Sequence, residues 1–223
     1  MEQHIVKIQT LETATHDVLR IRTSKPFFYP FVAGQATEVS INKNGWREKR
    51  KPFTFTSLLE DKYLEFFIKI YPTHNGVTNQ LLDIQKGDEL ILHEVFGDIA
   101  YQKEGVFIAG GAGITPFIAI FRDLVAKNQL AGNKLFFANK TKADIILQEE
   151  FEGMLGKNFI NILSDEEVDG YAHGFITEEF ITNNCDVMGK IFYVCGPPSM
   201  MEVTTILLKN LGVKEEHIVK ESF

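Results

Sequence analysis

Cysteine is scarce in this sequence: only Cys185 and Cys195 occur among 223 residues. Two thiolates cannot hold an iron–sulfur cluster, which takes four protein ligands. The six histidines show no zinc-ligand spacing. We expect no metal site, and no disulfide either, since the sequence shows no export signal. Any redox chemistry would therefore depend on an organic cofactor.

Long apolar runs and positive charge are also lacking. No stretch reaches the roughly 18 apolar residues of a membrane-spanning helix, and residues 1–20 do not resemble a secretory signal. The formal net charge of -7 disfavours a nucleic-acid partner. We expect a cytoplasmic monomer that binds neither membrane nor nucleic acid. One basic run, Trp46–Lys51, is either a solvated hairpin tip or a phosphate contact.

The first hundred residues have the composition of strands. Turn residues such as Gly34 and the pair Asn44-Gly45 separate these strands, and one short helix is expected at Val77–Ile84. Many short strands with a single helix predict a small antiparallel barrel. The expected strands are rich in β-branched and aromatic residues: His4–Glu12, Asp17–Ser24, Gln35–Asn42, Lys62–Tyr71 and Glu89–Val95.

The pattern changes near residue 101, where short apolar strands begin to alternate with helices. This alternation predicts an α/β domain with a parallel sheet wound on both faces. We therefore expect two domains, residues 1–101 and residues 102–223. The expected strands are 106–109, 135–138, 159–163 and 191–194, and the expected helices run from the glycine turn to about 128, over 145–155 and over 200–211.

A glycine-rich turn, Gly110–Pro116, follows the first of these strands and opens a helix. Glycines allow the backbone to approach a pyrophosphate, and the helix N-terminus offers free N–H groups. The match to the usual dinucleotide fingerprint is weak, because Pro116 stands where a third glycine is usual and the acidic ribose ligand is missing. A purely structural turn is the alternative.

A second abrupt turn, Cys195-Gly196-Pro197-Pro198, ends the strand at 191–194. Two prolines stop the strand and start the next helix. Ligands of a doubly wound sheet bind beyond the carboxyl ends of its strands, so Cys195 would lie within reach of a ligand on the glycine turn. A buried structural cysteine is the alternative.

Four segments in the right order resemble motifs of the ferredoxin–NADP⁺ reductase family, and the resemblance covers essentially the whole chain. Lys51–Ser57 resembles the flavin motif Arg-x-Tyr-Ser/Thr, and Gly76–Thr78 resembles the second flavin segment. Gly111–Pro116 and Cys195–Pro198 resemble the nicotinamide-side motifs. The resemblance implies a six-stranded antiparallel Greek-key barrel that binds FAD, followed by a five-stranded parallel sheet that binds NAD(P).

The resemblance also implies roles on the flavin side. Phe53 would lie against the flavin, and Thr54 would hydrogen-bond the ring nitrogen that accepts hydride. Phe223 would cover the other face of the ring, or would be a packed terminus. The residues expected to bind FAD are Lys51, Pro52, Phe53, Thr54, Gly76, Val77, Thr78 and Phe223.

On the nicotinamide side, Cys195 would position the ring, and Glu221 would be a catalytic acid or a solvated side chain. The expected catalytic residues are thus Thr54, Cys195 and Glu221. The residues expected to bind NAD(P) are Gly111, Gly113, Thr115, Pro116, Lys140, Cys195, Gly196, Pro197 and Met200.

Three positions depart from the family pattern. Lys51 replaces an arginine and keeps its charge but loses the bidentate fork, so FAD binding would be looser unless Arg50 helps. Phe53 replaces a tyrosine and lacks its hydroxyl. The segment His93-Glu94-Val95-Phe96-Gly97-Asp98 stands where the family commonly has a Gly-Pro-Phe-Gly turn.

The resemblance implies an NAD(P)H-dependent oxidoreductase with bound FAD. Its acceptor would be a separate electron-carrier protein, such as a flavodoxin, a ferredoxin or an oxygenase component. Reduction of free flavin and a non-catalytic nucleotide-binding subunit are the alternatives. Lys140 and Lys142 would suit the 2′-phosphate of NADPH, whereas Asp165 and Glu166 would repel it and suit NADH. The sequence slightly favours NADH as the donor.

Overall fold

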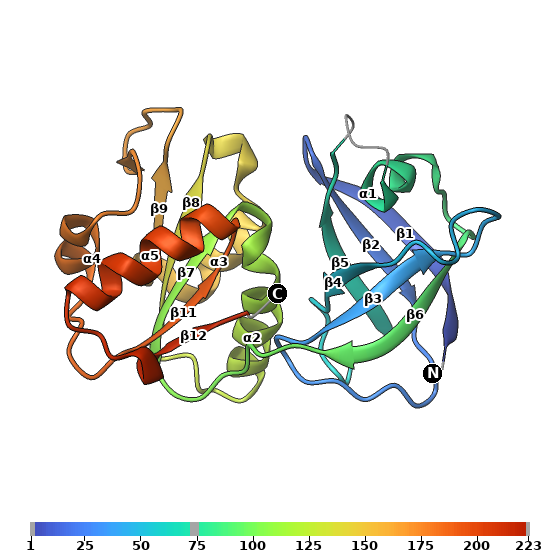
Figure 1. The fold of residues 1–223 in the computed structure, drawn as a ribbon, viewed down its shortest axis with the longest axis horizontal. Coiled ribbons are helices and arrows are strands. Elements are labelled where there is room, and N and C mark those ends of the chain that lie inside the picture. Colours follow the sequence, from blue (N-terminus) through green and yellow to red (C-terminus); the bar gives the residue numbers. More distant parts are fainter. Residues whose placement is uncertain (1–2, 72–75, 222–223) are drawn as a thin grey trace. The chain divides into compact units, whose positions relative to one another are not determined.

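The computed structural model describes residues 3–71 and 76–221. The chain divides into two compact units (Figure 1), one made of residues 1–100 with 115–123 and the other of residues 101–114 with 124–223. The division into domains 1–101 and 102–223 stays a prediction. Among the described residues, no helix is long and apolar enough to cross a membrane.

The first unit is a six-stranded antiparallel sheet with the order β4-β3-β6-β1-β2-β5. β6 lies between β3 and β1, so spatial order departs from chain order, as in a Greek key. The N–H of Thr56, just after β4, donates to the carbonyl of Glu65 on β5 at 2.9 Å. This bond joins the two ends of the sheet into a barrel. The strands are β1 (His4–Thr15), β2 (Val18–Ser24), β3 (Ala36–Ile41), β4 (Lys51–Thr54), β5 (Tyr63–Lys69) and β6 (Glu89–Phe96).

Alternating side chains of these strands fill the barrel. Leu64, Phe66 and Ile68 of β5 point into one core with Phe55, which follows β4. The short helix α1 (Val77–Gln80) and the 3-10 turn Leu81–Asp83 join this core through Val77 and Leu81. The expected barrel is confirmed. β4 was not expected as a strand, because it is short and contains Pro52, which is unusual within a sheet.

The second unit contains a parallel sheet with the order β10-β9-β8-β7-β11-β12. Helices α4 and α5 cover one face through Ile181 and Leu208, and on the other face Phe151 of α3 contacts Phe159 at 5.5 Å between ring centroids. The strands are β7 (Gly105–Gly110), β8 (Lys134–Asn139), β9 (Phe159–Leu163), β10 (Ala172–His173), β11 (Ile191–Cys195) and β12 (Ile218–Lys220), and the helices are α3 (Gln148–Leu155), α4 (Glu178–Asn184) and α5 (Pro198–Asn210). Helix α2 (Thr115–Ala126) follows β7, and its residues 115–123 group with the first unit.

The expected α/β class is confirmed, with three differences in detail. The sheet has six strands where five were expected, because the two-residue β10 pairs with the edge of β9. α4 and β12 were not expected, since both are short segments. α3 begins at Gln148, three residues later than expected, because Leu147 before it has a left-handed backbone with φ of 54°.

Candidate functional site: an FAD barrel and a nicotinamide edge

The flavin-side strand β4 pairs with β3, with Thr54 opposite Ala36 and Phe53 opposite Thr37. Thr54 is half-buried at the end of the strand. Phe53 is half-buried too and packs against the barrel core, so only part of its ring is left for a ligand. Lys51 and Pro52 are exposed.

The second flavin segment begins at Gly76, where a Cβ would meet no atom within 4 Å among the described residues. The Gly76 carbonyl accepts hydrogen bonds from the N–H groups of Asn79 and Gln80, both at 3.1 Å. Val77 is buried in the barrel core, so its side chain anchors the segment. Among the described residues, none therefore covers Gly76, while Val77 fixes the helix behind it in the barrel core.

On the nicotinamide side, the two glycine turns pack backbone against backbone. A Cβ on Gly113 would lie 2.3 Å from the carbonyl oxygen of Cys195 and 2.5 Å from Cα of Gly196. A Cβ on Gly110 would lie 2.3 Å from Sδ of Met200. The adjacent strands β7 and β11 bring these turns to one edge of the sheet. The structure thus brings together two motifs that are far apart in the sequence.

Gly111 lies on this edge with φ of 51°, and a Cβ there would meet no described atom within 4 Å. Gly111 is half-buried, and the free space at its Cα allows the close approach that a phosphate-binding turn requires. Thr115 and Pro116 are buried and begin α2. Residues 115–123 group with the first unit.

Cys195 ends β11 with its side chain buried. Its Sγ donates to Oε2 of Glu221 at 3.9 Å, since Glu221 follows β12, which pairs with β11. Burial, and then the negative charge of Glu221, raises the pKa of the Cys195 thiol well above 9.0. The thiol therefore keeps its proton at neutral pH, which fits a positioning group and not a nucleophile.

The carboxyl ends of β8 and β9 carry the groups expected to face the adenine-side ribose. Lys140 is exposed, and its carbonyl accepts from the N–H of Asp165 at 2.9 Å. Oε2 of Glu166 accepts from the N–H of Lys142 at 2.7 Å. The amide of Asn139 is buried, and neither its Nδ2 nor its Oδ1 has a hydrogen-bond partner among the described residues. A buried amide without a partner is costly, so this edge is suited to a polar ligand.

Several charged and polar residues of the barrel wall were not predicted from the sequence as part of the site. Glu65, Arg20 and Arg22 point outward from the barrel. Alternation of charged and apolar residues could have assigned them to the outer face of the sheet, but not to one another. His93, a departure from the family pattern, is buried in the barrel wall with Nε2 3.3 Å from Oγ of Ser40. Burial lowers the pKa of His93.

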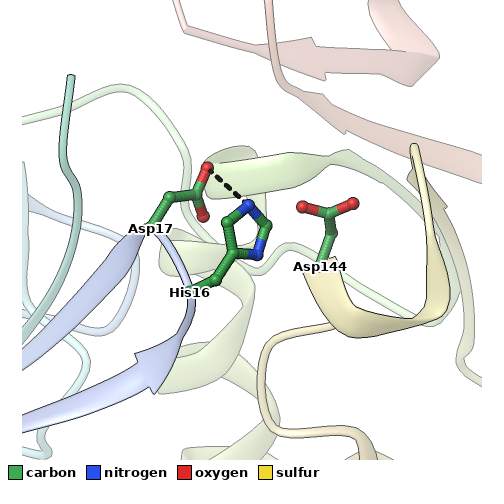
Figure 2. Close-up of side chains that lie close together, drawn as sticks. All are labelled: His16, Asp17 and Asp144. Carbon is green, nitrogen blue, oxygen red and sulfur yellow. Dashed lines mark ion pairs between the residues drawn. The ribbon is translucent and has the colours of Figure 1, made fainter. Parts of the chain in front are cut away.

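His16 and Asp17 lie in the turn between β1 and β2, with Nε2 and Oδ2 3.8 Å apart (Figure 2). Asp144, drawn in the same figure, belongs to the second unit, where its Oδ2 accepts from Oγ1 of Thr141 at 2.7 Å. We assign no metal site to these three groups, because they do not belong to one unit.

Comparison with known families assigns both halves of the chain. Residues 3–96 match the model of an FAD-binding domain, and residues 107–205 match that of an oxidoreductase NAD-binding domain. The chain belongs to the ferredoxin reductase-like flavoprotein oxidoreductases. The resemblance read from the sequence is thereby confirmed, as are the enzyme class and the cofactors FAD and NAD(P).

Relatives of this flavoprotein include the reductase component of propane 2-monooxygenase from Mycolicibacterium smegmatis, 28% identical over 97% of the chain. The ferredoxin–NAD(P)⁺ reductase component of the naphthalene 1,2-dioxygenase system of Pseudomonas putida is 25% identical over 97% of the chain. The chain spans 66% and 67% of the lengths of these two relatives. NADH–cytochrome b5 reductase 1 of Arabidopsis thaliana is 32% identical over 74% of the chain and 64% of its own length.

Solved structures agree on the fold. A cytochrome P450 reductase of Amycolatopsis superimposes with a TM-score of 0.86 and 23% identity, covering 99% of this chain and 70% of its own. A ferredoxin NADP⁺ reductase from Neisseria gonorrhoeae, with bound FAD and NADP, has a TM-score of 0.86 and 18% identity. The match covers 99% of this chain and 98% of the reductase chain. The individual site residues stay predictions, and Phe223 lies outside the described residues.

Proposed function

We propose that this flavoprotein is a reductase that takes hydride from NADH onto bound FAD and passes the electrons to a separate carrier protein. The packing of Gly113 against Cys195 and Gly196 carries the proposal, because it brings the two nicotinamide-side motifs together at one edge of the sheet, where a dinucleotide could contact both. Relatives that are named as reductase components of oxygenase systems support it.

Bound FAD supplies a ring that accepts hydride and releases electrons one or two at a time. The chain's own residues bind and orient it. Lys51 contributes an exposed positive charge for the phosphates, and the open backbone at Gly76 offers N–H groups. Thr54 is the proposed hydrogen-bonding partner of the flavin ring. Phe53 offers the part of its ring that the core leaves uncovered.

The nicotinamide dinucleotide binds to the second glycine edge in this proposal. Gly111 and Gly113 receive its pyrophosphate, with Thr115 and Pro116 at the start of α2. Cys195 stands beside the ring as a neutral thiol, and Glu221 holds the thiol proton by accepting its hydrogen bond. Lys140, Gly196, Pro197 and Met200 complete the proposed contacts.

NADH is the preferred donor in this proposal. The carboxylates of Asp165 and Glu166 lie on the segment that follows β9, next to Lys140 and Lys142 of the segment that follows β8. Their negative charge repels a 2′-phosphate, whereas a free ribose can donate hydrogen bonds to them. The side chain of Lys142 is engaged, with Nζ 5.5 Å from the centroid of the Tyr171 ring.

An anaerobic titration of the FAD-loaded protein with NADH and with NADPH tests this function. We expect loss of the oxidised flavin absorbance with either donor, at a lower concentration of NADH. Protein that acquires no yellow chromophore from added FAD would contradict the cofactor assignment. Bound FAD that neither donor reduces would contradict the catalytic function, and a strong NADPH preference would contradict the choice of donor.

The acceptor is proposed to be a ferredoxin, a flavodoxin or an oxygenase component, docked by the basic run Trp46–Lys51. This run is partly engaged within the unit: Arg47 Nε donates to Oδ1 of Asn42 at 2.7 Å, and Arg50 Nη1 lies 3.5 Å from Oε2 of Glu38. Electrostatic docking predicts that reduction of an acidic carrier slows as salt rises. Salt-insensitive turnover of free flavin at a higher rate would favour a flavin reductase instead.

A further inference from the structure

The carboxylate of Glu65 is fully buried on the outer face of the barrel. It lies opposite Arg22 in the β2–β5 pairing. Its Oε2 accepts from Nε of Arg20 and Nε of Arg22, both at 2.8 Å. Its Oε1 accepts from Nη1 of Arg122 at 2.6 Å and from Oγ1 of Thr56 at 3.1 Å. The two oxygens therefore accept hydrogen bonds from different elements. Oε2 binds side chains of β2, and Oε1 binds side chains of α2 and of the segment after β4.

Thr56 follows the proposed flavin ligand Thr54 by two residues and is held at three of its atoms. Its N–H donates to the Glu65 carbonyl at 2.9 Å, and its hydroxyl donates to the Glu65 carboxylate. Its own carbonyl accepts from Nη1 of Arg122 at 2.8 Å. The backbone that leads out of the flavin motif is thus fixed by Glu65 on one side and by Arg122 on the other.

Arg122 extends this network to helix α2, whose first turn carries Thr115 and Pro116. Residues 115–123 belong to the same compact unit as the barrel. An α-helix is stiff over the roughly two turns, about 10 Å, that separate Thr115 from Arg122. A bond that fixes Arg122 therefore also limits how the first turn of α2 can shift against the flavin motif.

We propose that Glu65 and Arg122 are positioning residues for hydride transfer, and that they hold the first turn of α2 in a fixed place relative to the flavin strand. The inference rests on the proposed function, since it assumes that Thr54 contacts FAD and that Thr115 contacts the nicotinamide dinucleotide. Displacement of about 1 Å between reacting groups can cost about 100-fold in rate, so a small slip of α2 suffices for a large effect.

The geometry offers a matched pair of variants. Arg20→Gln removes a guanidinium that binds Oε2 from β2, while Arg122→Gln removes one that binds Oε1 and Thr56 from α2. Both lower the positive charge around one buried carboxylate by the same amount. Only Arg122→Gln removes hydrogen bonds that join α2 to Glu65 and to the segment after the flavin strand, so the two variants separate a positioning role from a stabilising one.

The experiment compares wild type, Arg20→Gln, Arg122→Gln and Arg122→Lys as FAD-loaded proteins. Three quantities are measured: the dissociation constant for FAD, the absorption difference spectrum of bound FAD on addition of NAD⁺, and the rate of flavin reduction at saturating NADH. For Arg122→Gln we expect a reduction rate between about 10-fold and 100-fold below wild type, with a changed difference spectrum and an FAD dissociation constant within about threefold of wild type. Arg122→Lys should recover part of the rate, because it keeps the charge and one donor.

Arg20→Gln should reduce at the wild-type rate and give the wild-type spectrum. Equal rates and spectra for Arg20→Gln and Arg122→Gln would overturn the inference, as would a loss in Arg122→Gln that a higher FAD concentration restores. If Arg122→Gln does not fold, Arg122→Lys decides, because a wild-type rate and spectrum there would also overturn it. Failure of wild type to be reduced at all would contradict the proposed function and not the role of Arg122.

Discussion

Replacement of Glu65 by glutamine should change the pH dependence of barrel stability in a defined way. Burial alone would raise the pKa of this carboxyl, but the charge and hydrogen bond of Arg122, followed by those of Arg22 and Arg20, outweigh it and lower the pKa from 4.5 to about 2. A group whose pKa is lower in the folded state stabilises the fold above its unfolded pKa. That stabilisation is lost as the pH falls from 4.5 toward 2.

The size of the effect follows from the pKa difference. At about 1.36 kcal/mol for each pKa unit, ionised Glu65 contributes about 3 kcal/mol to the free energy of unfolding at pH 6. About 1.4 kcal/mol of this is lost by pH 3.5. Because Glu65→Gln retains every other titrating group, their contributions cancel in the difference between the two proteins. The gap in unfolding free energy should therefore narrow by about 1.4 kcal/mol between pH 6 and pH 3.5.

Urea unfolding of the apoprotein, followed by tryptophan fluorescence, measures this gap. Trp46 is the only tryptophan of the chain and packs against the barrel core, so its emission reports the unit that contains Glu65. With an m-value of about 1–2 kcal/mol per M, the difference between midpoints should shrink by about 1 M. Glu60→Gln, the same change on an exposed side chain of that unit, should alter the free energy by less than about 0.5 kcal/mol. A gap between wild type and Glu65→Gln that stays constant with pH would refute the reasoning.

Three further predictions concern the second unit. Gly113→Ala should lower the free energy of unfolding by about 3 kcal/mol, because its Cβ would lie 2.3 Å from the Cys195 carbonyl oxygen. Gly153→Ala, in α3 with nothing within 4 Å of its Cβ among the described residues, should instead raise it by about 0.5–1 kcal/mol; thermal unfolding of both variants checks the contrast. In a Cys185→Ala background, the buried Cys195 thiol should react with a disulfide reagent at pH 8 at least about 100-fold more slowly in the folded protein than in urea, since burial raises its pKa; equal rates would contradict its burial. Asp165→Asn should raise kcat/KM for NADPH about fivefold by removing a negative charge from the edge expected to face the 2′-phosphate, and steady-state rates that leave the NADPH value unchanged would exclude Asp165 as the discriminating group.

The sequence alone predicts those strands whose apolar residues alternate or form a continuous run. Alternating apolar residues in Tyr63–Lys69 and the apolar run Ile191–Cys195 predict strands, and both are strands in the structure. The two glycine turns lie at strand ends, and parallel strands bring their carboxyl ends to one edge. The contact between Gly113 and Cys195 is therefore a consequence of topology. The short strands β4, β10 and β12 escaped prediction because segments this short carry too little periodicity.

The Glu65 network escaped prediction for a different reason. A charged residue in an apolar strand is read as a solvent-facing position, and in a sheet with one wet face that reading is sound. Glu65 is buried only because Arg122 lies on a helix more than fifty residues further along the chain, and Arg20 and Arg22 lie on another strand. No local sequence pattern predicts that Glu65 lies next to these three arginines. A buried carboxylate is tolerated only when it is paired. The partners of Glu65 come from distant parts of the chain, so the pairing cannot be predicted from the local sequence. The same pairing joins α2 to the segment that follows the flavin motif.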